Sequence, residues 1–330
     1  MISLTKLQNL VKEGQVETMI VAFTDHYGRL LGKRVDADYF LNNVVKSGVH
    51  GCDYLMTTDM EMEPMPGYDY ASWELGYGDF HMVPDMTSLR VADWLEKTAI
   101  VLCDLHNRES HEAEAISPRT ILKRQVEKLK ATGFEAAAAT ELEYYLLQDT
   151  YREAFDKHYQ DLKSAGYYIE DYQILHGTRN DKFTSAIRRH LKNSGIPVET
   201  SKGEWGIGQH EINIKYADVT TMGDYHVLFK QCMKEVADAM GMSVTFMAKF
   251  DTDRAGSSSH IHMSLWKDGK NAFVGDEPIG PLSTSPLFRW FLGGWIQHAS
   301  EMMPFYAPTV NSYKRYIDGS WAPTRLAWSY

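Results

Sequence analysis

The chain has 330 residues, of which 44% are hydrophobic and 24% are charged, and its formal net charge is -10 at neutral pH. This composition is ordinary for a globular protein that is long enough to form two domains, and the negative charge argues against a nucleic-acid partner. Three cysteines without zinc-site spacing fit a reducing compartment. Because the N-terminus lacks an apolar signal core and no segment approaches the length of a membrane span, we expect a cytoplasmic protein without membrane contact.

The first 106 residues predict a small α+β domain. Apolar residues at helical or strand spacing, separated by turns that contain glycine, mark its elements. We expect a helix at 4–11, strands at 19–23 and 30–35, a helix at 36–48 capped by Asp36 or Asp38, and a strand at 100–103. Residues 50–90 are dominated by loops with short strands. Residues 107–116 are polar and form the predicted linker to a second domain.

Residues 117–330 predict a second domain in which helices and strands follow one another. Ser117-Pro118 and Ser285-Pro286 each provide a helix N-cap and a proline in the first turn. The expected helices cover 117–133, 180–195, 224–240 and 285–303, with Asn180 or Asp181 as the cap of the second. The expected strands cover 136–147, 196–200, 211–217, 242–250 and 260–266. Because the connections include hairpin signals such as Asp268-Gly269, we predict a mainly antiparallel sheet with helices on its outer side, not a Rossmann sheet.

One predicted strand carries two histidines on one face. Side chains alternate along a strand, so His260, His262 and Ser264 face one side, while the residues between them are apolar and suit a core. The preceding loop, residues 251–259, is polar. The pattern fits a metal or phosphate site, and it also fits a partly exposed polar strand face.

Two pairs of glutamates form the second candidate feature. On a strand, Glu141 and Glu143 lie side by side, and a divalent cation is the usual compensation for their repulsion. Two glycines between Glu204 and Glu211 permit a tight reversal that brings these carboxylates to one side of a hairpin. Taken singly, each pair also fits a solvated strand or hairpin surface.

Together, the glutamates and histidines indicate hard oxygen ligands with one or two imidazoles, which suit Mg²⁺ or Mn²⁺ rather than structural zinc. Four clustered glutamates need more than one cation, and a two-metal site is typical of phosphoryl transfer. The chain has no Walker A, kinase, GxGxxG or GxSxG motif. We therefore expect a nucleotide to be held through metals and basic side chains instead of a glycine-rich loop.

The chain resembles the glutamine synthetase family over nearly its whole length. Five segments fall in the order of the family's motifs, at residues 141–145, 204–211, 245–249, 260–265 and 308–315. The resemblance implies an α+β fold with a β-grasp domain at 1–106, a linker at 107–116, and a glutamine-synthetase-type catalytic domain at 117–330 with a curved antiparallel sheet and outer helices. It also implies a homo-oligomer, a dodecamer of two stacked hexamers with active sites between neighbouring subunits.

The same resemblance implies metal ligands. Glu143, Glu204 and Glu211 are expected to hold one metal ion, and Glu141 and His260 are expected to hold a second. The family continues beyond the position of Tyr330 with further arginines and the last ligand of the second metal. The resemblance therefore predicts that a C-terminal third is missing from this sequence and that the second metal site is incomplete.

The resemblance also implies substrate contacts. Gly256 and Arg315 are expected to bind glutamate, and His262 is expected to contact the transferred phosphate, so His262 and Arg315 are the expected catalytic residues. The family's ATP-binding positions correspond here to Glu199, Tyr216, His262 and Ser264. In the implied reaction, ATP phosphorylates the γ-carboxylate of glutamate, and an amine then displaces phosphate from γ-glutamyl phosphate.

Two departures from the ammonia-using members point to an organic amine. This chain has Ala255-Gly256 where those members have Asn-Gly, as in the γ-glutamylpolyamine branch, and it has Trp321 where they have a glutamate that helps to deprotonate ammonium. Since an indole accepts no proton but can line an apolar acceptor pocket, we expect an acceptor that is bulkier than ammonia.

The sequence thus favours an ATP-dependent glutamate–amine ligase that forms a γ-glutamylamide. One alternative is a glutamine synthetase that uses ammonia, and Ala255 and Trp321 argue against it. A second is a non-catalytic family member with a structural role, and the presence of all five expected metal ligands argues against that. A third is a simple metal-binding β protein, which would leave the motif from Asn311 to Arg315 unexplained.

Overall fold

The computed structural model describes residues 1–329, and Tyr330, the last residue of the predicted catalytic domain, lies outside the described residues. The chain divides into two compact units. Unit 1 comprises residues 1–128, 188–197 and 220–232, and unit 2 comprises residues 129–187, 198–219 and the chain from 233 onwards. Three helices contribute residues to both units, namely α4 (Pro118–Ala131), α6 (Ile174–Asn193) and α7 (Val219–Ala239). The linker boundaries predicted at 107 and 116 stay predictions.

Unit 1 contains a six-stranded sheet with the order β2-β1-β6-β4-β3, in which β5 also pairs with β6. Its elements are α1 (Leu4–Lys12), β1 (Thr18–Thr24), β2 (Leu30–Asp36), α2 (Ala37–Tyr39), the π-helix η1 (Phe40–Val44), α3 (Val45–Ser47), β3 (Val49–Cys52), the 3₁₀ helix η2 (Asp53–Met56), β4 (Asp79–Pro84), the 3₁₀ helix η3 (Met86–Ser88), β5 (Arg90–Val91) and β6 (Thr98–Asn107). The central strands β1 and β6 run parallel, whereas β1 and β2 form an antiparallel hairpin. This is the predicted β-grasp arrangement.

The alternating apolar residues of β1 explain the core of unit 1. Met19, Val21 and Phe23 are buried together with Leu7 and Leu10 of α1 in one apolar cluster. Their burial supplies the hydrophobic stabilisation that holds the helix on the sheet.

The helix predicted at 36–48 is irregular. Its centre is the π-helix η1, which separates α2 from α3. Asp36, not Asp38, is the N-cap, because its side chain accepts a hydrogen bond from the Tyr39 backbone amide.

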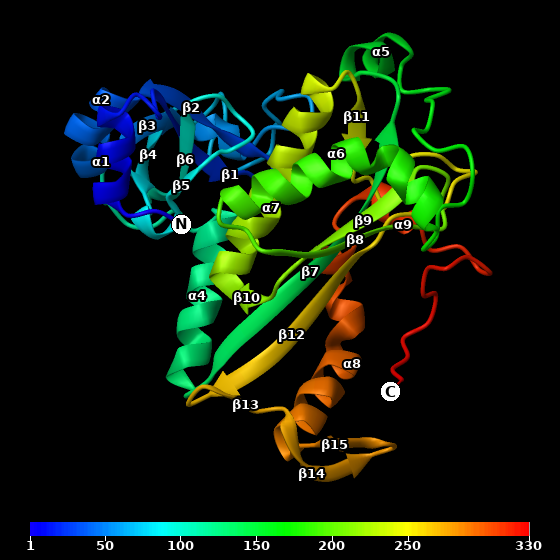
Figure 1. Cartoon of the computed structure of the whole chain (residues 1–330). Helices are drawn as coiled ribbons and strands as arrows, with labels where there is room; N and C mark the ends of the chain where they lie inside the picture. The colour runs from blue at the N-terminus through cyan, green and yellow to red at the C-terminus, as the bar shows by residue number, and fades with distance from the viewer. Residues whose placement is uncertain (330) are drawn as a thin grey trace. The chain divides into compact units, whose positions relative to one another are not determined.

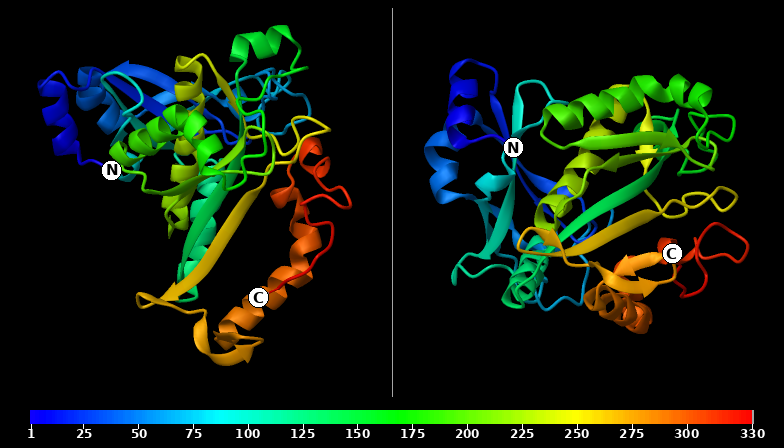
Figure 2. Two further views of the ribbon diagram at one scale, coloured as in Figure 1. Left: turned by 45° about the vertical axis from the view of Figure 1, so that its right-hand side comes forward. Right: turned by 60° about the horizontal axis from the view of Figure 1, so that its bottom comes forward.

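Unit 2 is built on a seven-stranded sheet with the order β13-β12-β7-β9-β8, and β10 and β11 also pair with β7 (Figure 1). Its other elements are β7 (Glu135–Leu147), α5 (Tyr151–Asp156), β8 (Val198–Gly203), β9 (Gln209–Ile214), β10 (Ala217–Asp218), β11 (Ser243–Thr245), β12 (Ser259–Lys267), β13 (Lys270–Asn271), β14 (Val274–Ile279), β15 (Leu282–Thr284), α8 (Pro286–Tyr306) and α9 (Val310–Tyr313). Every pairing in the large sheet is antiparallel, as predicted. The separate β14–β15 hairpin lies next to the beginning of α8 (Figure 2).

Alternate residues of the long strand β7 face opposite sides of the sheet. Leu142, Tyr144 and Leu146 are buried, and Tyr144 meets Phe183 of α6 edge-on. The alternate positions, which include Glu141 and Glu143, face the other side of the sheet. The alternation predicted for this strand is confirmed.

Of the predicted element boundaries, the three described next differ most from the structure. Helix α6 begins at Ile174 instead of 180, because Asn180 does not cap the helix and its side-chain amide contacts Glu170 and His210. Helix α7 begins at Val219 instead of 224. Strand β11 ends at Thr245 instead of continuing to 250. The chain after it contacts the loop at 255–258, where the Ser257 amide donates a hydrogen bond to the Ala248 carbonyl. Among the described residues, no helix is both long enough and apolar enough to cross a membrane.

Candidate active site

Three glutamates converge on one side of the unit 2 sheet. Glu143 of β7 lies directly opposite Glu211 of β9 in the strand register, and Glu204 follows the end of β8. Candidate ligand oxygens of these three side chains all lie within 4.8 Å of one another. The family resemblance predicted this carboxylate triad as one metal site, and the structure brings its three members together.

The turn between β8 and β9 places Glu204. Gln209 donates its backbone amide to the Gly206 carbonyl, and Glu204 donates its amide to the Gln209 carbonyl, at 2.8 Å each. Gly208 has φ +81°, a conformation that favours glycine. The predicted glycine-dependent reversal is therefore confirmed.

The electrostatics of the carboxylate triad favour a cation. Burial raises the pKa of Glu204 to about 7, and the nearby charges of Glu143 and Glu211 act in the same direction. Lys202, which forms an ion pair with Glu204, opposes this rise without cancelling it. Because Glu211 is only 5% exposed, water screens the mutual repulsion poorly, and a divalent cation would relieve it. The all-oxygen donor set fits Mg²⁺ or Mn²⁺.

Glu143 is held in place by hydrogen bonds. Its Oε2 accepts from the Ser258 backbone amide at 2.9 Å and from Gln209 Nε2 at 3.0 Å. Its Oε1 accepts from the Ser258 hydroxyl. These donors orient the carboxylate without neutralising it.

The second predicted metal pair also meets in the structure. His260 of β12 lies opposite Glu141 of β7 in register, and its Nδ1 is 3.1 Å from Glu141 Oε2. His262 reaches the same carboxylate, with Nε2 2.9 Å from Oε1. Burial raises the pKa of Glu141, but contacts with the two histidines outweigh it and leave that pKa below its ordinary value. One carboxylate thus sits between both same-face histidines.

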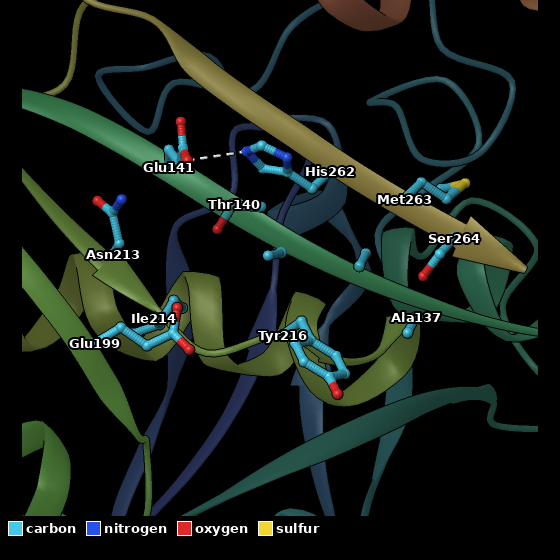
Figure 3. A pocket seen from close by; sticks show the side chains of 12 residues that line it. Ala137, Thr140, Glu141, Glu199, Asn213, Ile214, Tyr216, His262, Met263 and Ser264 are labelled. Atoms are coloured by element: carbon cyan, nitrogen blue, oxygen red, sulfur yellow. Dashed lines mark ion pairs between the residues drawn. The ribbon is translucent and has the colours of Figure 1, made fainter. Parts of the chain in front are cut away.

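A cavity of about 370 Å³ opens beside this pair. Its wall includes the four predicted ATP-binding residues Glu199, Tyr216, His262 and Ser264, together with Glu141. Figure 3 shows His262 pointing from β12 toward Glu141 of β7, with Glu199 and Tyr216 approaching from the opposite side. The exposed Tyr216 ring lies nearly parallel to Trp266, with ring centroids 6.4 Å apart. Such a flat aromatic surface suits a purine base.

The two residues predicted to bind glutamate are in close contact. A Cβ on Gly256 would lie 2.7 Å from Arg315 Cγ and 2.8 Å from the Ala248 carbonyl oxygen, so only glycine fits between them. Asn311 fixes the segment that carries Arg315, because its side chain exchanges two hydrogen bonds with the Lys249 backbone. The Arg315 Nε is buried without a hydrogen-bond partner among the described residues. An anionic ligand would satisfy this donor.

Trp321, the predicted acceptor residue, is 76% exposed and packs edge-on against Trp205. The two ring centroids are 5.4 Å apart. Trp205 directly follows Glu204, so the tryptophan pair lies at the border of the carboxylate triad.

Comparison with known proteins identifies the family and the fold. The glutamine synthetase catalytic-domain profile matches residues 115–330. The chain belongs to the glutamine synthetase family. Gamma-glutamylethanolamide synthetase GlnA4 of Streptomyces coelicolor is 40% identical over 98% of this chain and 69% of its own length. Glutamate–isopropylamine ligase of a Pseudomonas species is 33% identical over 98% of this chain and 70% of its own length. The solved structure of a GmaS/ADP complex superimposes with a TM-score of 0.79 at 26% identity, covering 97% of this chain and 68% of that one.

Several residues of this candidate site were not predicted from the sequence. Gln209, Ser258 and Trp205 contact predicted site residues, and Asn213 lines the cavity. Strand alternation could have indicated Gln209 and Asn213, because both lie two positions from Glu211 on the same face. The Ser258 and Trp205 contacts depend on how loops pack and have no signal in the sequence pattern.

Proposed function

We propose that this glutamine synthetase family member is an ATP-dependent ligase that joins the γ-carboxylate of glutamate to an organic amine. The main support is the adjacency of the carboxylate triad to the cavity: Glu141 lines the cavity and stands two positions from Glu143 on the same strand face. One of the two relatives described above is named a gamma-glutamylethanolamide synthetase and the other a glutamate–isopropylamine ligase, and both names agree with this proposal.

The chemistry has two balanced steps. A γ-carboxylate oxygen of glutamate attacks the γ-phosphorus of ATP, and the bond to the bridging oxygen of ADP breaks. The neutral amine nitrogen then attacks the γ-carbon, the bond between that carbon and the phosphorylated oxygen breaks, and the departing phosphate takes the proton that the amine loses. A cation held by Glu143, Glu204 and Glu211, and a second held by Glu141 and His260, would supply charge neutralisation on the phosphoryl oxygens.

The chain's own residues supply positioning. His262 lies at the cavity wall, where it can donate a hydrogen bond to the transferring phosphoryl group. Arg315, held against Gly256, offers its free Nε to a carboxylate of glutamate. Glu199, Tyr216 and Ser264 line the space for the nucleotide.

The tryptophan pair favours an organic amine. Neither Trp205 nor Trp321 can remove a proton from ammonium, whereas two indole rings can cover the carbon atoms of an alkylamine and attract its cationic form. Ala255, next to Gly256, has no side-chain amide, whereas ammonia-using members have asparagine at this position.

We further propose that the protein assembles as a dodecamer of two stacked hexamers in the cytoplasm. The exposure of large apolar side chains on α8 and α9 supports this proposal, because such surfaces are commonly covered by other protein chains. The exposed fraction is 75% for Trp290, 83% for Phe305 and 80% for Val310. The three cysteines are unpaired, which agrees with a reducing compartment. Mass photometry should give the mass of twelve subunits, and a monomeric mass would contradict the assembly.

Oxygen transfer from glutamate tests the proposed chemistry. Glutamate labelled with ¹⁸O in its γ-carboxylate is incubated with Mg²⁺, ATP and an alkylamine, and the released phosphate is analysed by mass spectrometry. One labelled oxygen per phosphate is the expected result. Unlabelled phosphate would mean that ATP is hydrolysed by water, and the ligase proposal would then fail.

A further inference from the structure

The side chain of Gln209 lies between the carboxylate triad and the loop at residues 255–258. It is 2% exposed, on the first residue of β9. Its Nε2 is 3.0 Å from Glu143 Oε2, 3.1 Å from the Gly256 carbonyl oxygen and 3.0 Å from Ser257 Oγ. Its Oε1 accepts from the Gly206 amide at 2.9 Å. A single buried amide therefore contacts a metal-site carboxylate, the loop next to Arg315 and the β8–β9 turn.

The loop at residues 255–258 is connected to Glu143 of the carboxylate triad by two routes. Ser258 binds Glu143 directly, and Gly256 and Ser257 each accept a hydrogen bond from the Gln209 amide that also binds Glu143. Two N–H groups shared by three acceptors form a network whose geometry depends on the position of each partner. A shift of Glu143 toward a cation changes the hydrogen bonds that Gln209 can give to Gly256 and Ser257.

We propose that Gln209 is a positioning residue that couples cation binding at the carboxylate triad to glutamate binding at the Gly256 loop. The inference rests on the proposed function, because it takes the triad as the cation site and the loop as the glutamate site. Coupling is reciprocal: glutamate tightens cation binding by the same factor by which the cation tightens glutamate binding.

The test measures cation affinity without catalysis. Mn²⁺ is titrated into the protein with and without saturating glutamate, in the absence of ATP, and free Mn²⁺ is quantified by electron paramagnetic resonance. Four proteins are compared: the unmodified chain, Gln209→Met, Ser257→Ala and Gln148→Met. Gln209→Met keeps the length of the side chain and removes its amide, whereas Ser257→Ala removes one acceptor on the loop side only. Gln148, an exposed glutamine just after β7, provides the matched control.

The expected results differ among the variants. Glutamate should tighten Mn²⁺ binding in the unmodified chain and in Gln148→Met. In Ser257→Ala, Mn²⁺ affinity without glutamate should stay within about twofold while the glutamate effect shrinks. In Gln209→Met, Mn²⁺ affinity should fall by about tenfold, which is the change expected when a hydrogen bond to a buried charge is lost. The effect of glutamate on Mn²⁺ affinity should vanish.

Two outcomes overturn the inference in distinguishable ways. In the first, the unmodified chain binds Mn²⁺, but glutamate either has no effect on that binding or has the same effect in Gln209→Met and Ser257→Ala. The coupling role of Gln209 is then wrong, and the proposed function is unaffected. If the unmodified chain binds no Mn²⁺ at all, the cation site and the proposed function fail together. If the circular dichroism spectrum shows that Gln209→Met is unfolded, the glutamate effect in Ser257→Ala tests the coupling by itself.

Discussion

Replacing Glu204 by glutamine should stabilise the cation-free protein and remove its cation response. Glu204 has 16% of its side chain exposed, and its pKa is raised from 4.5 to about 7 by burial and by the two neighbouring carboxylates. Holding its negative charge in the folded state without a cation therefore costs roughly 3 kcal/mol. Glutamine has a similar shape and carries no charge, so it avoids this cost.

The sign of the pH dependence follows from proton linkage. Between the ordinary carboxyl pKa and about 7, the folded protein keeps the Glu204 proton that the unfolded chain has lost. The free energy of unfolding of the cation-free protein should thus fall as pH rises through this window, by up to roughly 3 kcal/mol, and level off above it. Because a cation binds the ionised carboxylate, Mg²⁺ affinity should rise over the same window.

Urea denaturation at several pH values, with a chelator or with Mg²⁺, measures both effects. We expect the decline with pH and the Mg²⁺ stabilisation in the unmodified chain and in Glu135→Gln, an exposed control at the start of β7, but not in Glu204→Gln. Glu204→Ala should also lose ATP turnover while keeping its fold. Equal pH profiles and equal Mg²⁺ responses in Glu204→Gln and the unmodified chain would refute the metal assignment.

Three further predictions concern the substrates. Trp321→Glu should shift amine preference toward ammonium in a competition assay, because it restores a proton acceptor; an unchanged amine profile would contradict the acceptor assignment. Tyr216→Ala should raise the KM for ATP by about tenfold through the loss of base stacking, and an unchanged KM would remove Tyr216 from the nucleotide site. Arg315→Met should raise the KM for glutamate by about tenfold or more while leaving ADP affinity, measured by calorimetry, within twofold; equal loss of both would indicate a folding defect.

Strand alternation accounts for the part of the site that could be predicted. It placed Glu141 and Glu143 on one face of β7 and His260 and His262 on one face of β12, and the register confirms that these strands are neighbours. The glycine turn before Glu211 was likewise readable from the chain. These features depend on local backbone geometry, which the sequence pattern encodes directly.

The remaining features depend on packing between distant segments. The Gln209 contacts require β9 to pair with β7 in one register and the loop at 255–258 to fold onto them. Asn180 was one of two residues predicted to cap a helix, but its side-chain amide binds buried groups, so a tertiary contact overrides the local preference. The tryptophan pair joins Trp205 to a residue more than a hundred positions away, and no local pattern indicates it.

Phosphate release with Mg²⁺, ATP and glutamate, across a panel of amines, tests the central claim most directly. The panel contains ammonium, methylamine, isopropylamine, ethanolamine, putrescine and aniline. We expect turnover with at least one organic amine to exceed turnover with ammonium. Turnover with ammonium alone would make the protein a glutamine synthetase and remove the role assigned to Trp321, and no turnover with any amine despite nucleotide binding would support a non-catalytic role.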